Sequence, residues 1–119
     1  MNEAKFQPAV EKIVKEIYDK YPDLLTRYGE RGVERTKEDN MHHFKHLETA
    51  YMLRNFEIMT QYAVWLNGIL TSRGMSTSLL IDNFNMIRAV IPSMETWEKE
   101  ERAFYLEAVE QAISVLQKQ

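Results

Sequence analysis

Apolar residues recur every three or four positions along most of the chain, which is the spacing of one face of an α-helix. Between residues 4 and 21, such a face is formed by Phe6, Val10, Ile13, Val14, Ile17 and Tyr21. Pro22 and Gly29 then bound one short helical turn. A long helix is expected after it, from about Val33 to Arg54.

Three further helices are predicted in the rest of the chain, over about residues 56–72, 76–91 and 95–117. Each follows a residue type whose side chain caps helices, and these residues are Asn55, Ser76 and Ser93. Gly74 and Pro92 are typical of helix ends. The connections are short, as between neighbouring packed helices. The sequence therefore predicts an all-α fold, a compact bundle of four main helices plus an additional short helix, forming a single domain over residues 1–119.

The composition excludes several function classes. The chain has no cysteine, which rules out thiol catalysis, thiolate metal sites and disulfides. Its net charge is only −3 and no basic patch appears, so nucleic acid is not an expected partner. No apolar run reaches the roughly 18 residues of a membrane span, and the first residues lack the apolar core of a signal peptide. We expect no membrane association and a cytoplasmic location.

All three histidines fall in the segment "HHFKH". On the expected long helix, Phe44 marks the face toward the core. His43 then lies on the shoulder of that face, whereas His42 and His46 point largely away from it. The histidines therefore do not form one cluster.

Asp39 stands one helical turn before His43 and can accept a hydrogen bond from its ring, with His42 and His46 in solvent. Alternatively, Asp39, His43 and His46 could hold the metal of a metal-dependent hydrolase. The chain offers no further histidine and no Glu-x-x-His motif, so no metal is expected. In a third interpretation, His43 lines a ligand pocket.

Two other features bear on such a pocket. Asn83 falls beside the apolar face of its expected helix, where its amide must find partners, either in a neighbouring helix or in a pocket. Tyr62 and Trp65 lie three positions apart, either as part of the core or as pocket walls. No serine occurs in a "GxSxG" elbow, and no catalytic residue is predicted. The acidic run "METWEKEERAF" is interpreted as a solvated face.

The segment "LETAYMLRNFEIMTQYAVWLNGILTSRGMSTSLLIDNFNMIRAVI" resembles the helical cap of bacterial cobalamin-binding modules. The matching positions are Leu66, Leu70, Arg73, Gly74, Leu80 and Ile87. The stretch "YGERG" followed by "ED…H…L" also resembles helical segments of bacterial sensor proteins. The resemblance implies an all-helical sensor or ligand-binding domain, in which Trp65 could sit over a flat cofactor.

The sequence departs from the cobalamin-binding pattern in two places. No "DxHxxG" signature of the α/β cobalamin-binding domain occurs in the chain. Light-sensing relatives carry "EH" about ten residues after the tryptophan, whereas "MS" stands at that distance from Trp65 here. The sequence therefore requires no cofactor, and any ligand is unknown.

The sequence favours a non-catalytic bacterial-type helical sensor or ligand-binding module. Its apolar inter-helix pocket would be lined by His43, Tyr62, Trp65 and Asn83, with Asp39 behind His43. The alternative is a protein–protein interaction domain, forming a homo-oligomer or binding another protein, without a small-molecule ligand. The metal-dependent hydrolase is the third hypothesis.

Overall fold

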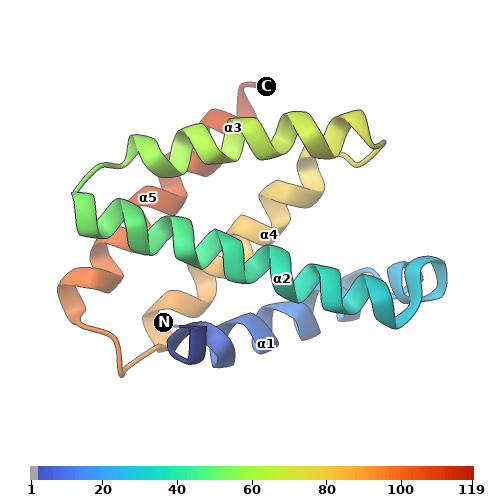
Figure 1. Cartoon of the computed structure of the whole chain (residues 1–119), viewed down its shortest axis with the longest axis horizontal. Coiled ribbons are helices and arrows are strands. Elements are labelled where there is room, and N and C mark those ends of the chain that lie inside the picture. The colour runs from blue at the N-terminus through green and yellow to red at the C-terminus, as the bar shows by residue number, and fades with distance from the viewer. Residues whose placement is uncertain (1–2) are drawn as a thin grey trace. The chain divides into compact units, whose positions relative to one another are not determined.

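A computed structural model describes residues 3–119, and this part of the chain is all-helical, without a strand (Figure 1). Its helices are α1 (Glu3–Lys20), α2 (Asp23–Leu53), α3 (Glu57–Ser72), α4 (Thr77–Val90), the short 3₁₀-helix η1 (Ile91–Ser93) and α5 (Lys99–Gln117). The predicted all-α class is confirmed. Within residues 3–119, no helix combines the length and apolar character that crossing a membrane requires.

The chain divides into two compact units, and the boundary falls inside α2. The first unit extends to Lys45 and holds α1 and the larger part of α2. The second unit runs from His46 to Gln119 and holds the end of α2 with all later helices.

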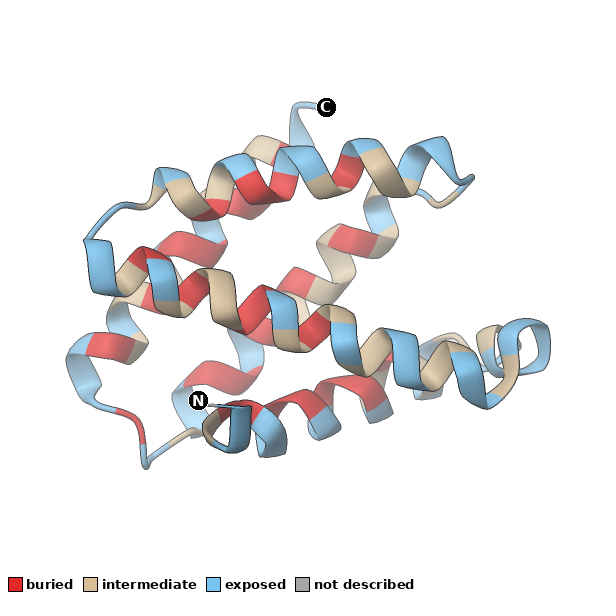
Figure 2. Ribbon diagram, viewed as in Figure 1, coloured by how far each residue is buried: buried red, intermediate tan, exposed pale blue. Residues whose placement is uncertain are grey.

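In the first unit, α1 buries one side of its surface (Figure 2). The buried residues are Phe6, Ala9, Val10, Ile13, Val14 and Ile17. The ring of Phe6 stacks on that of Phe44 in α2, with 5.3 Å between the ring centroids and 12° between the planes. The predicted apolar face of the first helix is thus a core face, joined to α2 by this aromatic stack.

The expected short helical segment and the long helix are both present within α2, where they meet at a kink at Gly29. Gly29 interrupts the helical geometry with φ 64° and ψ −160°, a backbone conformation open essentially to glycine alone. Three residues later, a Cβ at Gly32 would lie only 2.6 Å from the Cβ of Tyr28. The backbone at the kink therefore favours glycine at both positions. Leu25 and Tyr28, which precede the kink, are exposed.

In the second unit, α5 packs against both α3 and α4. Aromatic side chains connect α5 with the end of α2 and with the loop before α3. The ring of Tyr51 meets Phe104 at 5.5 Å and Tyr105 at 5.9 Å, in edge-to-face arrangements. Phe56 stacks on Phe104 at 4.3 Å, and Trp97 meets Tyr105 edge-to-face at 5.7 Å.

Two of the three predicted caps are present. The Ser76 hydroxyl accepts a hydrogen bond from the backbone N–H of Leu79 at 3.3 Å. The side-chain oxygen of Asn55 accepts one from the N–H of Glu57 at 3.0 Å, at the start of α3. Gly74 ends the turn after α3 with φ 85°.

The prediction that Ser93 caps the last helix is wrong. The chain continues past α4 into η1, and the Ser93 hydroxyl donates to the carbonyl of Val90 at 2.7 Å. The last helix begins only at Lys99. Pro92 at the start of η1 suits this tight turn, because its φ is already fixed near the helical value.

Candidate functional site

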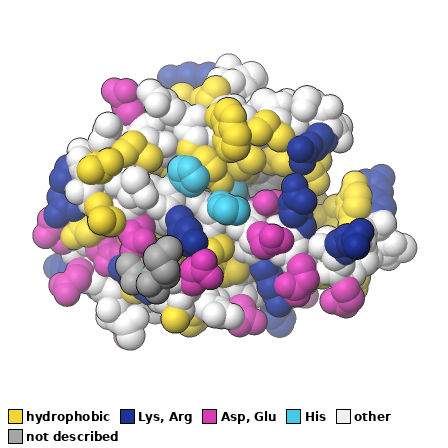
Figure 3. All heavy atoms as spheres, viewed as in Figure 1, with side chains coloured by type: hydrophobic (Ala, Val, Ile, Leu, Met, Phe, Trp, Pro, Cys, Tyr) yellow, Lys and Arg dark blue, Asp and Glu magenta, His cyan; other side chains and the backbone are white. Residues whose placement is uncertain are grey.

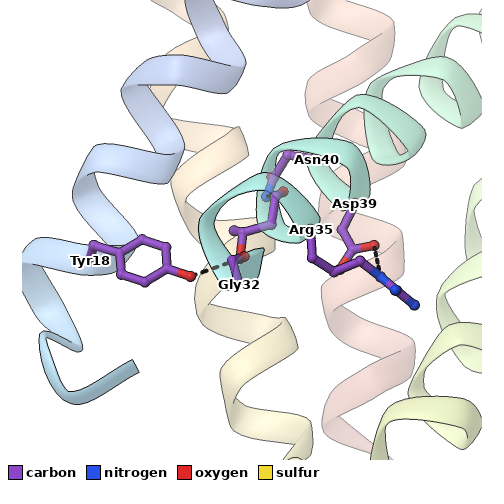
Figure 4. A network of polar contacts seen from close by, with 6 residues as sticks. Tyr18, Gly32, Arg35, Asp39 and Asn40 are labelled. Carbon is purple, nitrogen blue, oxygen red and sulfur yellow. Dashed lines mark hydrogen bonds and ion pairs between the residues drawn. The ribbon is translucent and has the colours of Figure 1, made fainter. Parts of the chain in front are cut away.

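A polar network connects α1 and α2 inside the first unit (Figure 4). The Thr36 hydroxyl donates to the carbonyl of Gly32 at 2.9 Å, so the Tyr18 hydroxyl, 3.2 Å away, is the donor toward Thr36. Fully buried Asn40 donates to the carbonyl of Thr36 at 3.1 Å. These bonds satisfy polar groups within the helix pair and account for an asparagine on the core face.

Asp39 lies at the exposed edge of this network. Its carboxylate is 4.0 Å from Nε of Arg35, one turn earlier on α2 (Figure 4). The predicted hydrogen bond from His43 to Asp39 stays a prediction. An exposed pair of this kind contributes little to stability.

The three histidines have different environments, and the expectation that His46 lies in solvent like His42 is wrong. His43 is buried, with 2% of its surface exposed, and His42 is exposed. His46 is half-buried, and its ring stacks on Tyr62 with 3.7 Å between centroids and 15° between planes. Within residues 3–119, no group of three or more His, Asp or Glu side chains is placed to hold a metal ion.

A hollow of about 270 Å³ opens between α1 and α2 of the first unit. It is lined by Glu3, Gln7, Val10, Glu11, Lys37, Glu38, Met41, His42 and Lys45. Lys45 donates to the carboxylate of Glu3 at 2.7 Å, and this hydrogen bond and its charge hold the pKa of Glu3 below its ordinary value. The hollow is thus lined mainly by charged side chains of both signs, unlike the apolar pocket predicted from the sequence.

The four residues predicted for that pocket lie in different surroundings. Tyr62 is buried on α3 and Asn83 is half-buried on α4, both in the second unit. Trp65 has 62% of its surface exposed, and its ring centroid is 6.3 Å from that of Tyr62. His43 belongs to the first unit, and the grouping of all four stays a prediction.

Trp65 therefore lies outside the core, although the spacing of apolar positions on α3 includes it. Next to it, the rings of buried Tyr62 and half-buried His46 continue a ladder of three rings. Hydrophobic side chains gather over α3 on the face shown in Figure 3.

Sequence reasoning missed two buried polar groups in the second unit. Glu101 belongs to the acidic run interpreted as solvated, yet only 4% of its surface is exposed, and it accepts a hydrogen bond from Tyr105. Asn67 on α3 is 5% exposed. Among residues 3–119, its side-chain oxygen is a buried atom without a hydrogen-bond partner. Glu101 stands four positions before Tyr105, one helical turn, and this spacing is the sequence signal that could have indicated their hydrogen bond.

The hydroxyl of Tyr105 is held in its protonated form. Burial in the aromatic cluster raises its pKa well above the ordinary tyrosine value, and the hydrogen bond to Glu101 raises it further. A tyrosine that stays protonated is a permanent donor, which fits a structural role in the core.

No protein-family model, no curated protein and no solved structure matches the chain significantly.

Proposed function

We propose that the chain is a non-catalytic helical binding module that binds protein through the exposed face of α3 around Trp65. In this proposal the chain acts as one domain of four main helices plus a short one. A protein-binding surface on α3 thus replaces the enclosed apolar pocket as the proposed binding site.

The observation that carries the proposal is the exposure of Trp65. A tryptophan with 62% of its surface in solvent is unusual on a small protein, whereas tryptophan is enriched among the residues that dominate protein interfaces. Val64 beside it is also exposed. Elsewhere in the same unit, Met52 and Leu53 at the end of α2 are also exposed apolar side chains.

The hollow of the first unit is a weaker candidate for a ligand-binding site than the exposed face of α3. Its walls are charged, and the Glu3–Lys45 pair already occupies part of its polar surface. Small-molecule sites are mostly apolar with a few convergent polar groups. The Asp39 carboxylate lies 4.0 Å from Nε of Arg35, which favours an ion pair there over a metal-dependent hydrolase site.

Native mass spectrometry of freshly purified protein tests the proposal, using the wild type, Trp65→Ser and Tyr28→Ser. Tyr28 is a matched control, because it is an exposed aromatic residue on the other unit. We expect an assembly in the wild type and in Tyr28→Ser, and its loss in Trp65→Ser. A monomer without any bound protein in the wild type, or an assembly unaffected by Trp65→Ser, would contradict the proposal.

A second candidate function is supported by the ladder of rings. An exposed tryptophan backed by Tyr62 and His46 can also stack on a flat cofactor, as the resemblance to cobalamin-binding caps implies. Titration with hydroxocobalamin tests this candidate. Saturable quenching of tryptophan emission that disappears in Trp65→Phe would favour cofactor binding, and linear quenching equal in both proteins would reject it.

A further inference from the structure

The exposed face of α3 is free of charge. Residues 58–72 contain no Asp, Glu, Lys or Arg, in a chain of which 28% is charged. The helix carries its one acidic residue, Glu57, at its start, and Arg73 follows its end. Charged residues are depleted at the centres of protein interfaces, where aromatic residues are enriched.

One stripe of this face is fully exposed. Gln61, Trp65, Gly68 and Ser72 are separated by four, three and four positions, which places them along one line of the helix surface. All four are exposed. The stripe therefore carries the largest side chain, Trp65, three positions before Gly68, which has no side chain.

Trp65 and Gly68 form a projection and a notch. Helical side chains lean toward the N-terminus, and the Trp65 ring accordingly lies near Tyr62, one turn back. A Cβ placed on Gly68 would meet nothing within 4 Å, so the backbone there is open to an approaching side chain. The notch lets the backbone of a second helix approach closely at this point.

We propose that the partner is a second copy of the chain, with the two α3 helices antiparallel about a two-fold axis between Trp65 and Gly68. This inference rests on the proposed function and adds the occupant, the symmetry and the register. The axis places the Cα of Trp65 of each copy opposite the partner's Gly68, with the Trp65 ring leaning toward the partner's Ser72, so the same close approach is used twice. Gln61 of each copy then faces the partner's Ser72.

The charges at the helix ends fit the same arrangement. Glu57 and Arg73 are both exposed, at opposite ends of α3. Antiparallel pairing brings Glu57 of one copy to within about one helical turn of the partner's Arg73, at each end of the pair. A parallel pair would instead bring like charges together at both ends, which is unfavourable. The macrodipoles of antiparallel helices are also favourably aligned.

Single-cysteine cross-linking tests the register, because the chain contains no cysteine of its own. Gln61→Cys and Ser72→Cys are prepared separately, mixed, and cross-linked by mild oxidation and by a short bismaleimide. Both positions are exposed, and circular dichroism verifies the fold. Ser114→Cys on exposed α5 surface, mixed with Gln61→Cys, measures random collision.

We expect the mixed Gln61→Cys/Ser72→Cys product to exceed either homotypic product by about ten-fold or more, since homotypic positions would be offset by about 16 Å along the helix axis. Homotypic products would indicate a parallel pair and overturn the inference. Cross-linking no stronger than the Ser114→Cys control, in a protein whose assembly still depends on Trp65, would also overturn it while the proposed function stands. Absence of any assembly in native mass spectrometry would overturn both.

Discussion

The hydroxyl of Tyr105 donates a hydrogen bond to the carboxylate of Glu101, one turn earlier on α5, and both residues are buried in the second unit. Trp97 and Tyr51 pack edge-to-face against the Tyr105 ring. A buried carboxyl group is costly unless it is hydrogen-bonded, so this bond ties the first turn of α5 to the aromatic core.

Removing the hydroxyl weakens the second unit. Tyr105→Phe preserves the ring packing but takes a donor from the buried Glu101 carboxylate. We expect a loss of about 1–3 kcal/mol in the free energy of unfolding, measured by urea denaturation. Tyr28→Phe, at an exposed tyrosine, is the control and should leave the midpoint unchanged. Equal midpoints for Tyr105→Phe and wild type would show that the bond contributes nothing.

Alkaline pH should destabilise the wild type more than Tyr105→Phe. The folded protein holds the pKa of Tyr105 above its ordinary value of 10.0, so above that pH the unfolded chain releases a proton that the folded chain retains. The protonated hydroxyl makes its full contribution to the free energy of unfolding below pH 10, and this contribution falls as the pH rises further. Unfolding free energies of both proteins between pH 8 and about pH 11 measure the difference. Parallel pH profiles would contradict the raised pKa.

Two glycines of α2 and α3 should respond to alanine with opposite signs. Gly32→Ala places a Cβ 2.6 Å from that of Tyr28, and we expect a loss of about 1–3 kcal/mol. Gly68→Ala meets open space in a regular helix, and the better helix propensity of alanine should stabilise the monomer by up to about 1 kcal/mol. Thermal unfolding in dilute solution measures both changes. Stabilisation by Gly32→Ala would contradict the close packing at the kink.

The helices could be predicted from the sequence because apolar periodicity and capping residues are local signals. Ser76 caps α4 as expected, and Gly74 ends the preceding turn. The break at Gly29 was expected as a helix end and is a kink between two helical segments, because a kink and a helix end can both require a glycine with positive φ. The local sequence therefore does not distinguish between them.

The candidate site was harder to predict, since burial is decided by residues far away in the sequence. Trp65 fits the apolar stripe of α3, yet the neighbouring helices leave it exposed. Glu101 has an acidic neighbourhood typical of a solvated face, yet it is buried and hydrogen-bonded to Tyr105. His43 could be placed correctly because its position relative to Phe44 depends on helix geometry alone.

The two tryptophans should differ in their access to quenchers. Trp65 is 62% exposed, whereas Trp97 is 3% exposed and packs on Tyr105. In dilute solution, where any assembly is dissociated, iodide should quench a large part of wild-type emission. Trp65→Phe should remove this quenchable part and leave a blue-shifted emission from Trp97. Strong iodide quenching that persists in Trp65→Phe would contradict the assigned surface.

Sedimentation equilibrium of the wild type and Gly68→Gln tests the role of α3 most directly. The glutamine side chain fills the notch without adding charge, at a position where a Cβ meets nothing in the monomer. We predict that the wild type self-associates and that Gly68→Gln weakens the association by about ten-fold or more, with an unfolding temperature at least as high as that of the wild type. Equal association of the two proteins, or a monomeric wild type at every concentration, would contradict α3 as the binding surface.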